Sequence, residues 1–118
     1  MTRQEVFEWC KQKYGTKPDY PWGDRNAVLR HKENKKWYGV VIEVRQDKFG
    51  LLGNRKVDVL NLKCDPMTID FLQRQDGYFP AYHMNKVNWI SVLLGGPAPN
   101  EEVKNLIDIS YKNTSSVK

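Results

Sequence analysis

The residue types best suited to binding or proton transfer lie close together in the second half of the chain. They are Tyr82, His83, Asn85, Lys86 and Trp89. Lys86 would supply a positive charge, Asn85 a hydrogen-bond donor and acceptor, and His83 an imidazole that accepts or donates a proton. Such a group suits a small anionic metabolite that carries a phosphate or a carboxylate. The alternative is structural: a turn asparagine, a solvated lysine and a neutral histidine bonded to the backbone.

A catalytic nucleophile would have to be Cys64, which follows Lys63 and precedes an expected helix start. A neighbouring cation and a helix N-terminus both lower the pKa of a thiol, and a Cys64–His83 pair is the minimum for covalent catalysis. A small cysteine in a strand-to-helix corner is more often buried and inert. The chain has no glycine-rich phosphate loop, no paired catalytic carboxylates and no Gly-x-Ser-x-Gly motif. We therefore predict that the protein is not an enzyme.

Metal and cofactor binding are not predicted either, because His83 has no second ligand at the spacing of a zinc or iron site. The length of 118 residues suits one domain spanning residues 1–118. No apolar run approaches the roughly 20 residues needed to cross a bilayer, and the first residues lack the apolar centre of a signal peptide. We expect a cytoplasmic monomer without a membrane partner, and we expect Cys10 and Cys64 to be free thiols.

Positive charge is concentrated in residues 25–56, although the whole chain carries a net charge of +5. A lysine pair beside an aromatic side chain can place phosphate contacts next to a stacking surface. The expected nucleic-acid-binding residues are Arg30, Lys32, Lys35, Lys36, Trp37, Lys48, Arg55 and Lys56. No helix has the Arg/Asn/Gln face of a major-groove reader, so we expect DNA or RNA binding without sequence specificity. The alternative is that these side chains are the solvated tips of hairpins.

Capping and turn residues predict where the helices begin and end. Thr2 and Glu5 form a capping box, and Asp65 followed by Pro66 is a typical helix start. The expected helices are 2–14, 65–75 and 99–112, and the expected strands are 26–31, 37–44, 57–63, 78–82 and 88–94. Residues 113–118 are expected to be a disordered tail. In the loop before the first strand, Tyr20 and Trp22 are expected to plug the edge of the core.

The order of these elements, α-β-β-β-α-β-β-α, predicts the fold class. Apolar and polar residues alternate in the strands, which is typical of an antiparallel sheet with one face covered and the other largely wet. We therefore predict an α+β two-layer sandwich, in which a five-stranded antiparallel sheet carries its helices on one face.

The chain resembles the MmcQ/YjbR-like family in several segments that occur in the same order. The most specific are Asn61–Pro66 and the run Ala81–Lys86 with Trp89. Further matches are Tyr20–Asp24, Val92–Leu94 with Gly96, and Leu106–Asp108 with Ser110 and Tyr111. Two positions differ, since Ala81 stands where the family usually has glycine and Asn88 where it commonly has histidine.

The resemblance implies an α+β fold like that of secretion chaperones and bacterial frataxin. It also implies a non-enzymatic DNA-binding role through two "wings", and this is our leading expectation. One alternative is the anionic metabolite site around His83 and Lys86. A second alternative is a protein-interaction or chaperone-like module, for which an exposed apolar patch would be the sign.

Overall fold

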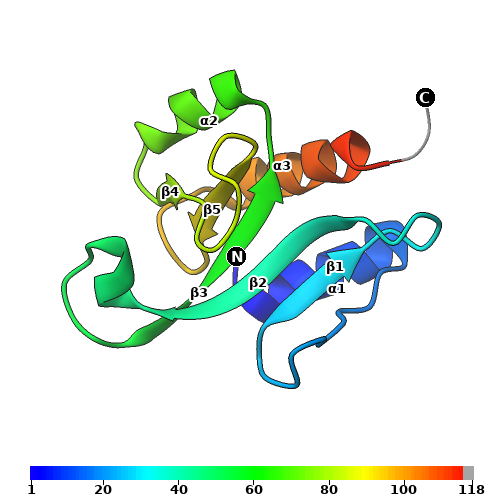
Figure 1. Cartoon of the computed structure of the whole chain (residues 1–118), viewed down its shortest axis with the longest axis horizontal. Coiled ribbons are helices and arrows are strands. Elements are labelled where there is room, and N and C mark those ends of the chain that lie inside the picture. Colours follow the sequence, from blue (N-terminus) through cyan, green and yellow to red (C-terminus); the bar gives the residue numbers. More distant parts are fainter. Residues whose placement is uncertain (116–118) are drawn as a thin grey trace.

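Within residues 1–115, which the computed structural model describes, a single antiparallel sheet has the strand order β1-β2-β3-β5-β4 (Figure 1). Along the chain the elements are α1 (Arg3–Tyr14), β1 (Ala27–Arg30), β2 (Trp37–Arg45), the 3-10 helix η1 (Gln46–Phe49), β3 (Lys56–Lys63), α2 (Pro66–Gln73), β4 (Tyr78–Pro80), β5 (Trp89–Leu93) and α3 (Asn100–Asn113). The predicted order of helices and strands is confirmed, and η1 is an addition to it.

The helices begin at the capping residues that the sequence contains. The Thr2 hydroxyl accepts from the Glu5 amide at 3.2 Å, and the Glu5 carboxylate accepts from the Thr2 amide at 2.8 Å. Asp65 accepts from the Thr68 amide at 2.9 Å at the start of α2. Gly15 ends α1 with φ 69°, a conformation that favours glycine. Local chemistry therefore sets these boundaries.

One hydrophobic core lies between the sheet and the helices. Figure 1 shows α1 and α3 behind the sheet, while α2 lies beside β4. The apolar side chains that the helices contribute to the core are Val6, Phe7, Cys10, Ile69, Leu72, Val103, Leu106 and Ile107. Their partners on the sheet include Leu29, Val41, Leu60, Leu62, Ile90 and Val92. The predicted two-layer α+β fold with helices on one face is confirmed.

The opposite face of the sheet, which we call the outer face, is not largely wet as expected. Val28, Val40, Val59, Asn61 and Ser91 are all buried on it, at 1% exposure or less. The register places Val28 beside Val40, Val40 beside Asn61, and Asn61 beside Ser91. The segment after β4 folds back across this row, so the expectation of a wet face is wrong for the centre of the sheet.

The end of the chain also differs from the expectation of a disordered tail from residue 113. Asn113 is the last residue of α3, and Thr114 is buried. The Thr114 hydroxyl lies 2.7 Å from Nε2 of the buried His31, which holds the end of α3 against the turn after β1. The expectation is therefore wrong for these two residues, and 116–118 lie outside the described residues. Among residues 1–115, no helix has both the length and the apolar character of a membrane span.

Candidate functional site

Most of the residues that the sequence suggests for an anion site belong to one loop, Tyr82–Lys86, which crosses the outer face of the sheet. Two buried side chains hold its start. The Asn61 amide donates to the Tyr82 carbonyl at 2.9 Å, and the Tyr82 amide donates to the Ser91 hydroxyl at 2.9 Å. The Ser91 hydroxyl in turn donates to the Asn61 side-chain oxygen. Because these bonds come from β3 and β5, the sheet itself positions the loop.

Within the loop, the backbone of His83 adopts φ 58°, a left-handed conformation that side chains other than glycine rarely take. Such a conformation persists only where the surrounding structure enforces it, and it is often found at functional sites. Asn85 accepts from the Val87 amide at 2.8 Å, so its side chain shapes the turn, as the structural alternative predicts. The loop has a groove on either side.

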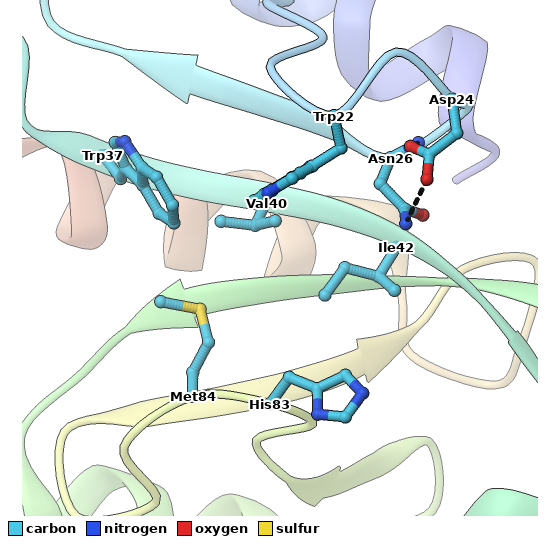
Figure 2. Close-up of a pocket in the computed structure, with 8 residues that line it drawn as sticks. All are labelled: Trp22, Asp24, Asn26, Trp37, Val40, Ile42, His83 and Met84. Carbon is cyan, nitrogen blue, oxygen red and sulfur yellow. Dashed lines mark hydrogen bonds between the residues drawn. The ribbon is translucent and has the colours of Figure 1, made fainter.

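The larger groove has a volume of about 450 Å³ and lies between the loop and the segment before β1 (Figure 2). Trp22 and Trp37 line one side of it, and His83 and Met84 line the other, as Figure 2 shows. Val40 and Ile42 of β2 lie between them. The residues come from three separate parts of the chain, and most of the lining is apolar.

The position of Trp22 beside Trp37 depends on how the segment before β1 is attached to the sheet. Asp19 and Val28 exchange backbone hydrogen bonds of 2.9 and 2.7 Å, which fixes this segment beside β1. Trp22 then meets Trp37 edge to face, with ring centroids 5.9 Å apart. Trp22 is 51% exposed and Tyr20 is 46% exposed, so the expectation that they plug the core is wrong.

One end of the larger groove is polar and acidic. The Asp24 carboxylate accepts from the Asn26 amide at 2.9 Å, and Asn26 accepts from the Glu43 amide of β2 at 2.9 Å. Both side chains are thereby fixed in place. Within residues 1–115, no lysine or arginine lines this groove or forms an ion pair with Asp24. The groove therefore combines aromatic walls with a carboxylate that forms no ion pair among the described residues.

The smaller groove, of about 230 Å³, lies on the other side of the loop. Its lining includes Lys48 and Phe49 of η1, Phe79 and Pro80 of β4, and Tyr82 and Lys86 of the loop. The Phe49 ring centroid lies 5.1 Å from that of Phe79 and 5.4 Å from that of Tyr82. This groove is basic and aromatic where the larger one is acidic and aromatic.

The structure divides the residues that the sequence placed in one anion site. His83 lines the larger groove, whereas Tyr82 and Lys86 line the smaller one. Asn85 and Trp89 line neither of these grooves, and Trp89 begins β5 beside Lys63. The residues expected in a single site around His83 and Lys86 therefore line two separate grooves. Among the remaining lining residues, Trp22 stood out in the sequence as an aromatic in a proline- and glycine-rich loop, and Trp37 and Lys48 stood out as expected nucleic-acid-binding residues.

The expected nucleic-acid-binding residues form two groups at opposite ends of β2. Arg30, Lys32, Lys35, Lys36 and Trp37 lie near its start, and Lys48, Arg55 and Lys56 lie beyond its end. A strand of this length spans roughly 30 Å at about 3.3 Å per residue. Figure 1 shows the two ends of β2 on opposite sides of the molecule. These basic side chains do not gather on one continuous surface.

Some of these cations are also engaged by neighbouring groups. The Arg30 guanidinium pairs with Asp19 at 2.9 Å and lies 5.4 Å from the centroid of the Trp37 ring. Lys56 lies 3.9 Å from Glu43. Both contacts reduce the positive field that a phosphate backbone would meet.

The suggested nucleophile is not activated. Cys64 is buried at 2% exposure, and this burial raises the pKa of its thiol to about 11. The thiol therefore stays protonated at neutral pH despite its place before α2. Cys10 is buried as well, and both cysteines are free. Among the described residues, no cluster of three or more His, Cys, Asp or Glu side chains could hold a metal ion.

Two large apolar side chains are exposed one turn apart on α2, Met67 at 83% and Phe71 at 63%. Such a pair is the feature that the protein-interaction alternative requires. No observation shows that a partner binds this pair, so the protein-interaction alternative stays a prediction.

The comparisons with known proteins agree on the family. The family model described as YjbR matches residues 11–113. An uncharacterized Bacillus subtilis protein, YyaQ, is 46% identical over 116 residues, which cover 97% of this chain and 98% of that protein. The uncharacterized Escherichia coli K12 protein YjbR is 26% identical over 95% of this chain and 86% of its own length.

Solved structures give the same result. A crystal structure of a Pseudomonas syringae protein, 42% identical, superimposes with a TM-score of 0.95 over 98% of this chain and all of that one. A Deinococcus radiodurans protein at 22% identity shares the fold, with a TM-score of 0.74 over 98% of this chain and 79% of that one. The chain therefore belongs to the YjbR family.

Proposed function

We propose that this YjbR-family protein is a non-enzymatic binding module, and that its ligand is a small, flat, mostly apolar molecule held in the larger groove. The observation that supports this most strongly is the arrangement of Trp22 and Trp37 opposite Met84, with the groove open to solvent. Exposed aromatic surface at the rim of a hollow is typical of a ligand site, because a bound molecule removes that surface from water.

The size and charge of the larger groove restrict the ligand further. A volume of about 450 Å³ falls within the roughly 300–1,000 Å³ of small-molecule sites. Asp24 is a carboxylate at its end, and no lysine or arginine of residues 1–115 lines it. An anion is therefore disfavoured here. The groove suits a neutral molecule or an organic cation with an N–H group that can donate to Asp24, and tryptophan faces attract such cations.

A fragment screen by NMR tests this proposal. Neutral and cationic heteroaromatic fragments are added to ¹⁵N-labelled protein, and the indole N–H signals of Trp22 and Trp37 are followed. We expect hits to shift these two signals and to lose binding in Trp22→Ala. Tyr20→Ala is the matched control, since Tyr20 lies in the same segment with similar exposure but does not line the groove. If the hits bind Trp22→Ala with the same affinity as the unaltered protein, the larger groove is excluded as their binding site.

Binding of single-stranded nucleic acid is a second candidate function. It is favoured by one observation: Lys35 and Lys36 lie beside Trp37, whose ring also faces Trp22. Stacked bases next to phosphate contacts are typical of single-strand binding. The division of the basic residues between the two ends of β2 argues for a short contact at one end.

Fluorescence anisotropy with single-stranded and duplex DNA at two salt concentrations tests this second candidate. If it is correct, Lys35→Glu with Lys36→Glu abolishes binding, while Lys48→Glu with Lys56→Glu at the opposite end leaves binding nearly unchanged. Equal losses in both double variants would indicate attraction by net charge alone. Absence of binding at low salt would rule it out.

A further inference from the structure

The smaller groove brings together two lysines from segments that are far apart in the sequence. Lys48 belongs to η1, and Lys86 ends the loop that crosses the outer face of the sheet. Neither lysine forms an ion pair within residues 1–115. The carboxylate nearest to Lys48 in sequence, that of Asp47, is instead held by Arg45 at 2.8 Å. The groove therefore carries two ammonium groups that no carboxylate pairs with in the part of the chain that the structure describes.

Aromatic rings line the same groove. Phe49 packs against both Phe79 and Tyr82, with tilted rings. Phe49 reaches this position because η1 turns the connection between β2 and β3 back toward β4. Gly50 ends that turn with φ 72°, a conformation that glycine adopts without strain. Apolar rings and lysine ammonium groups thus line one hollow.

We infer that the smaller groove is a second binding site, for a small organic anion in which a carboxylate or a phosphate is attached to a single flat ring. The rings of Phe49, Phe79 and Tyr82 provide the surface for the flat part, and the ammonium groups of Lys48 and Lys86 attract the oxyanion. Neither kind of contact alone selects this ligand, since lysines alone would bind any anion weakly.

The volume of the groove suits a ligand with one ring. An apolar cavity of about 150 Å³ holds a benzene molecule. A groove of about 230 Å³ therefore accommodates a benzene-sized ring together with its acidic group. This site does not depend on the function proposed for the larger groove, which is lined by other side chains.

Titration with four simple probes, followed by ¹⁵N NMR, tests the inference. Benzoate and phenyl phosphate carry both features, benzamide carries the ring without the charge, and inorganic phosphate carries the charge without the ring. We expect benzoate or phenyl phosphate to shift the amide signals of Lys48, Phe49 and Tyr82 at millimolar concentration. Benzamide and inorganic phosphate should bind several-fold more weakly. The indole signals of Trp22 and Trp37 should stay in place.

Substitution of the lysines gives the second arm of the test. Because both ammonium groups are solvent-exposed, we expect Lys48→Gln and Lys86→Gln each to weaken binding by about 2- to 5-fold, and the double variant by more. Lys36→Gln is the matched control, since it removes the same charge at the other end of β2.

Four results would overturn the inference. The first is that neither aromatic anion shifts these signals. The second is that benzamide or inorganic phosphate binds as tightly as the aromatic anions. The third is that Lys36→Gln weakens binding as much as Lys48→Gln does, which would show attraction by net charge alone. Shifts confined to Trp22 and Trp37 would also refute it, because the probes would then occupy the larger groove.

Discussion

Replacing Ser91 with alanine tests whether the buried bonds between β3 and β5 hold the Tyr82–Lys86 loop. The Ser91 hydroxyl accepts from the Tyr82 amide and donates to Asn61, and both Ser91 and Asn61 are fully buried. Alanine leaves one donor and one acceptor without a partner. An unpaired buried polar group costs about 1–3 kcal/mol. We therefore expect the free energy of unfolding to fall by about 2–4 kcal/mol, against typical totals of about 5–15 kcal/mol.

Urea unfolding, followed by far-ultraviolet circular dichroism, measures this loss. Thr68→Val is a suitable control, because it removes one hydroxyl bond to Asp65 at the exposed start of α2. We expect that control to lose less than about 1 kcal/mol. Amide hydrogen exchange of residues 82–86 should increase in Ser91→Ala and stay unchanged in Thr68→Val, because only the former releases the loop.

A double-mutant cycle that combines Ser91→Ala with Asn61→Ala tests whether the two side chains stabilise the protein together. Asn61 donates to the Tyr82 carbonyl and accepts from Ser91, so the two side chains share one hydrogen bond. We expect the double variant to lose about 1–2 kcal/mol less than the sum of the two single losses. Additive losses, or a loss below about 0.5 kcal/mol for Ser91→Ala, would refute the idea that these bonds act as one network.

Three further predictions concern the larger groove, a buried histidine and a glycine. Trp22→Ala removes about 100 Å² of exposed aromatic surface, so we expect roughly 60-fold weaker ligand binding by NMR titration with less than about 1 kcal/mol lost in urea unfolding. Burial lowers the pKa of His31, so the unfolded state binds the proton first. Stability should therefore fall as the pH drops below about 6.5, and less steeply in His31→Gln, as urea midpoints at several pH values will show. Gly77→Ala, at φ 94° with Pro97 only 3.1 Å from the added carbon, should lower the unfolding free energy by about 1–3 kcal/mol. A urea midpoint for Gly77→Ala equal to that of the unaltered protein would contradict this last prediction.

Most of the fold could be predicted because its signals are local. The Thr2–Glu5 capping box, the Asp65–Pro66 helix start and the alternating residues of β2 each act within a few positions of the chain. Strand ends were less predictable. The fourth strand was expected to reach Tyr82 but ends at Pro80, because the Tyr82 backbone bonds to Asn61 and Ser91 side chains in place of a neighbouring strand.

The candidate sites could be predicted only in part. The Tyr82–Lys86 run pointed to the right loop, but it did not show that His83 and Lys86 line different grooves. That separation depends on the path of the loop across the sheet, because the centroids of the Tyr82 and His83 rings lie only 4.0 Å apart and yet the two residues line different grooves. Lys48 was expected to contact nucleic acid, but its place beside Phe49 and Lys86 could not be predicted. The direction taken by the connection between β2 and β3 depends on packing against β4.

The sequence by itself determined the family, the element order and the fold class, because caps, periodicity and a specific residue run are encoded within short stretches. Only the tertiary structure decided which charges and rings share a surface. Trp22 and Met84 line one groove, and Lys48 and Lys86 line another, although they come from segments far apart in the sequence. The same pairing keeps Lys35 and Lys48 at opposite ends of β2. Electrostatic attraction and stacking act over a few ångströms, so distance in space, and not along the chain, determines what each groove can bind.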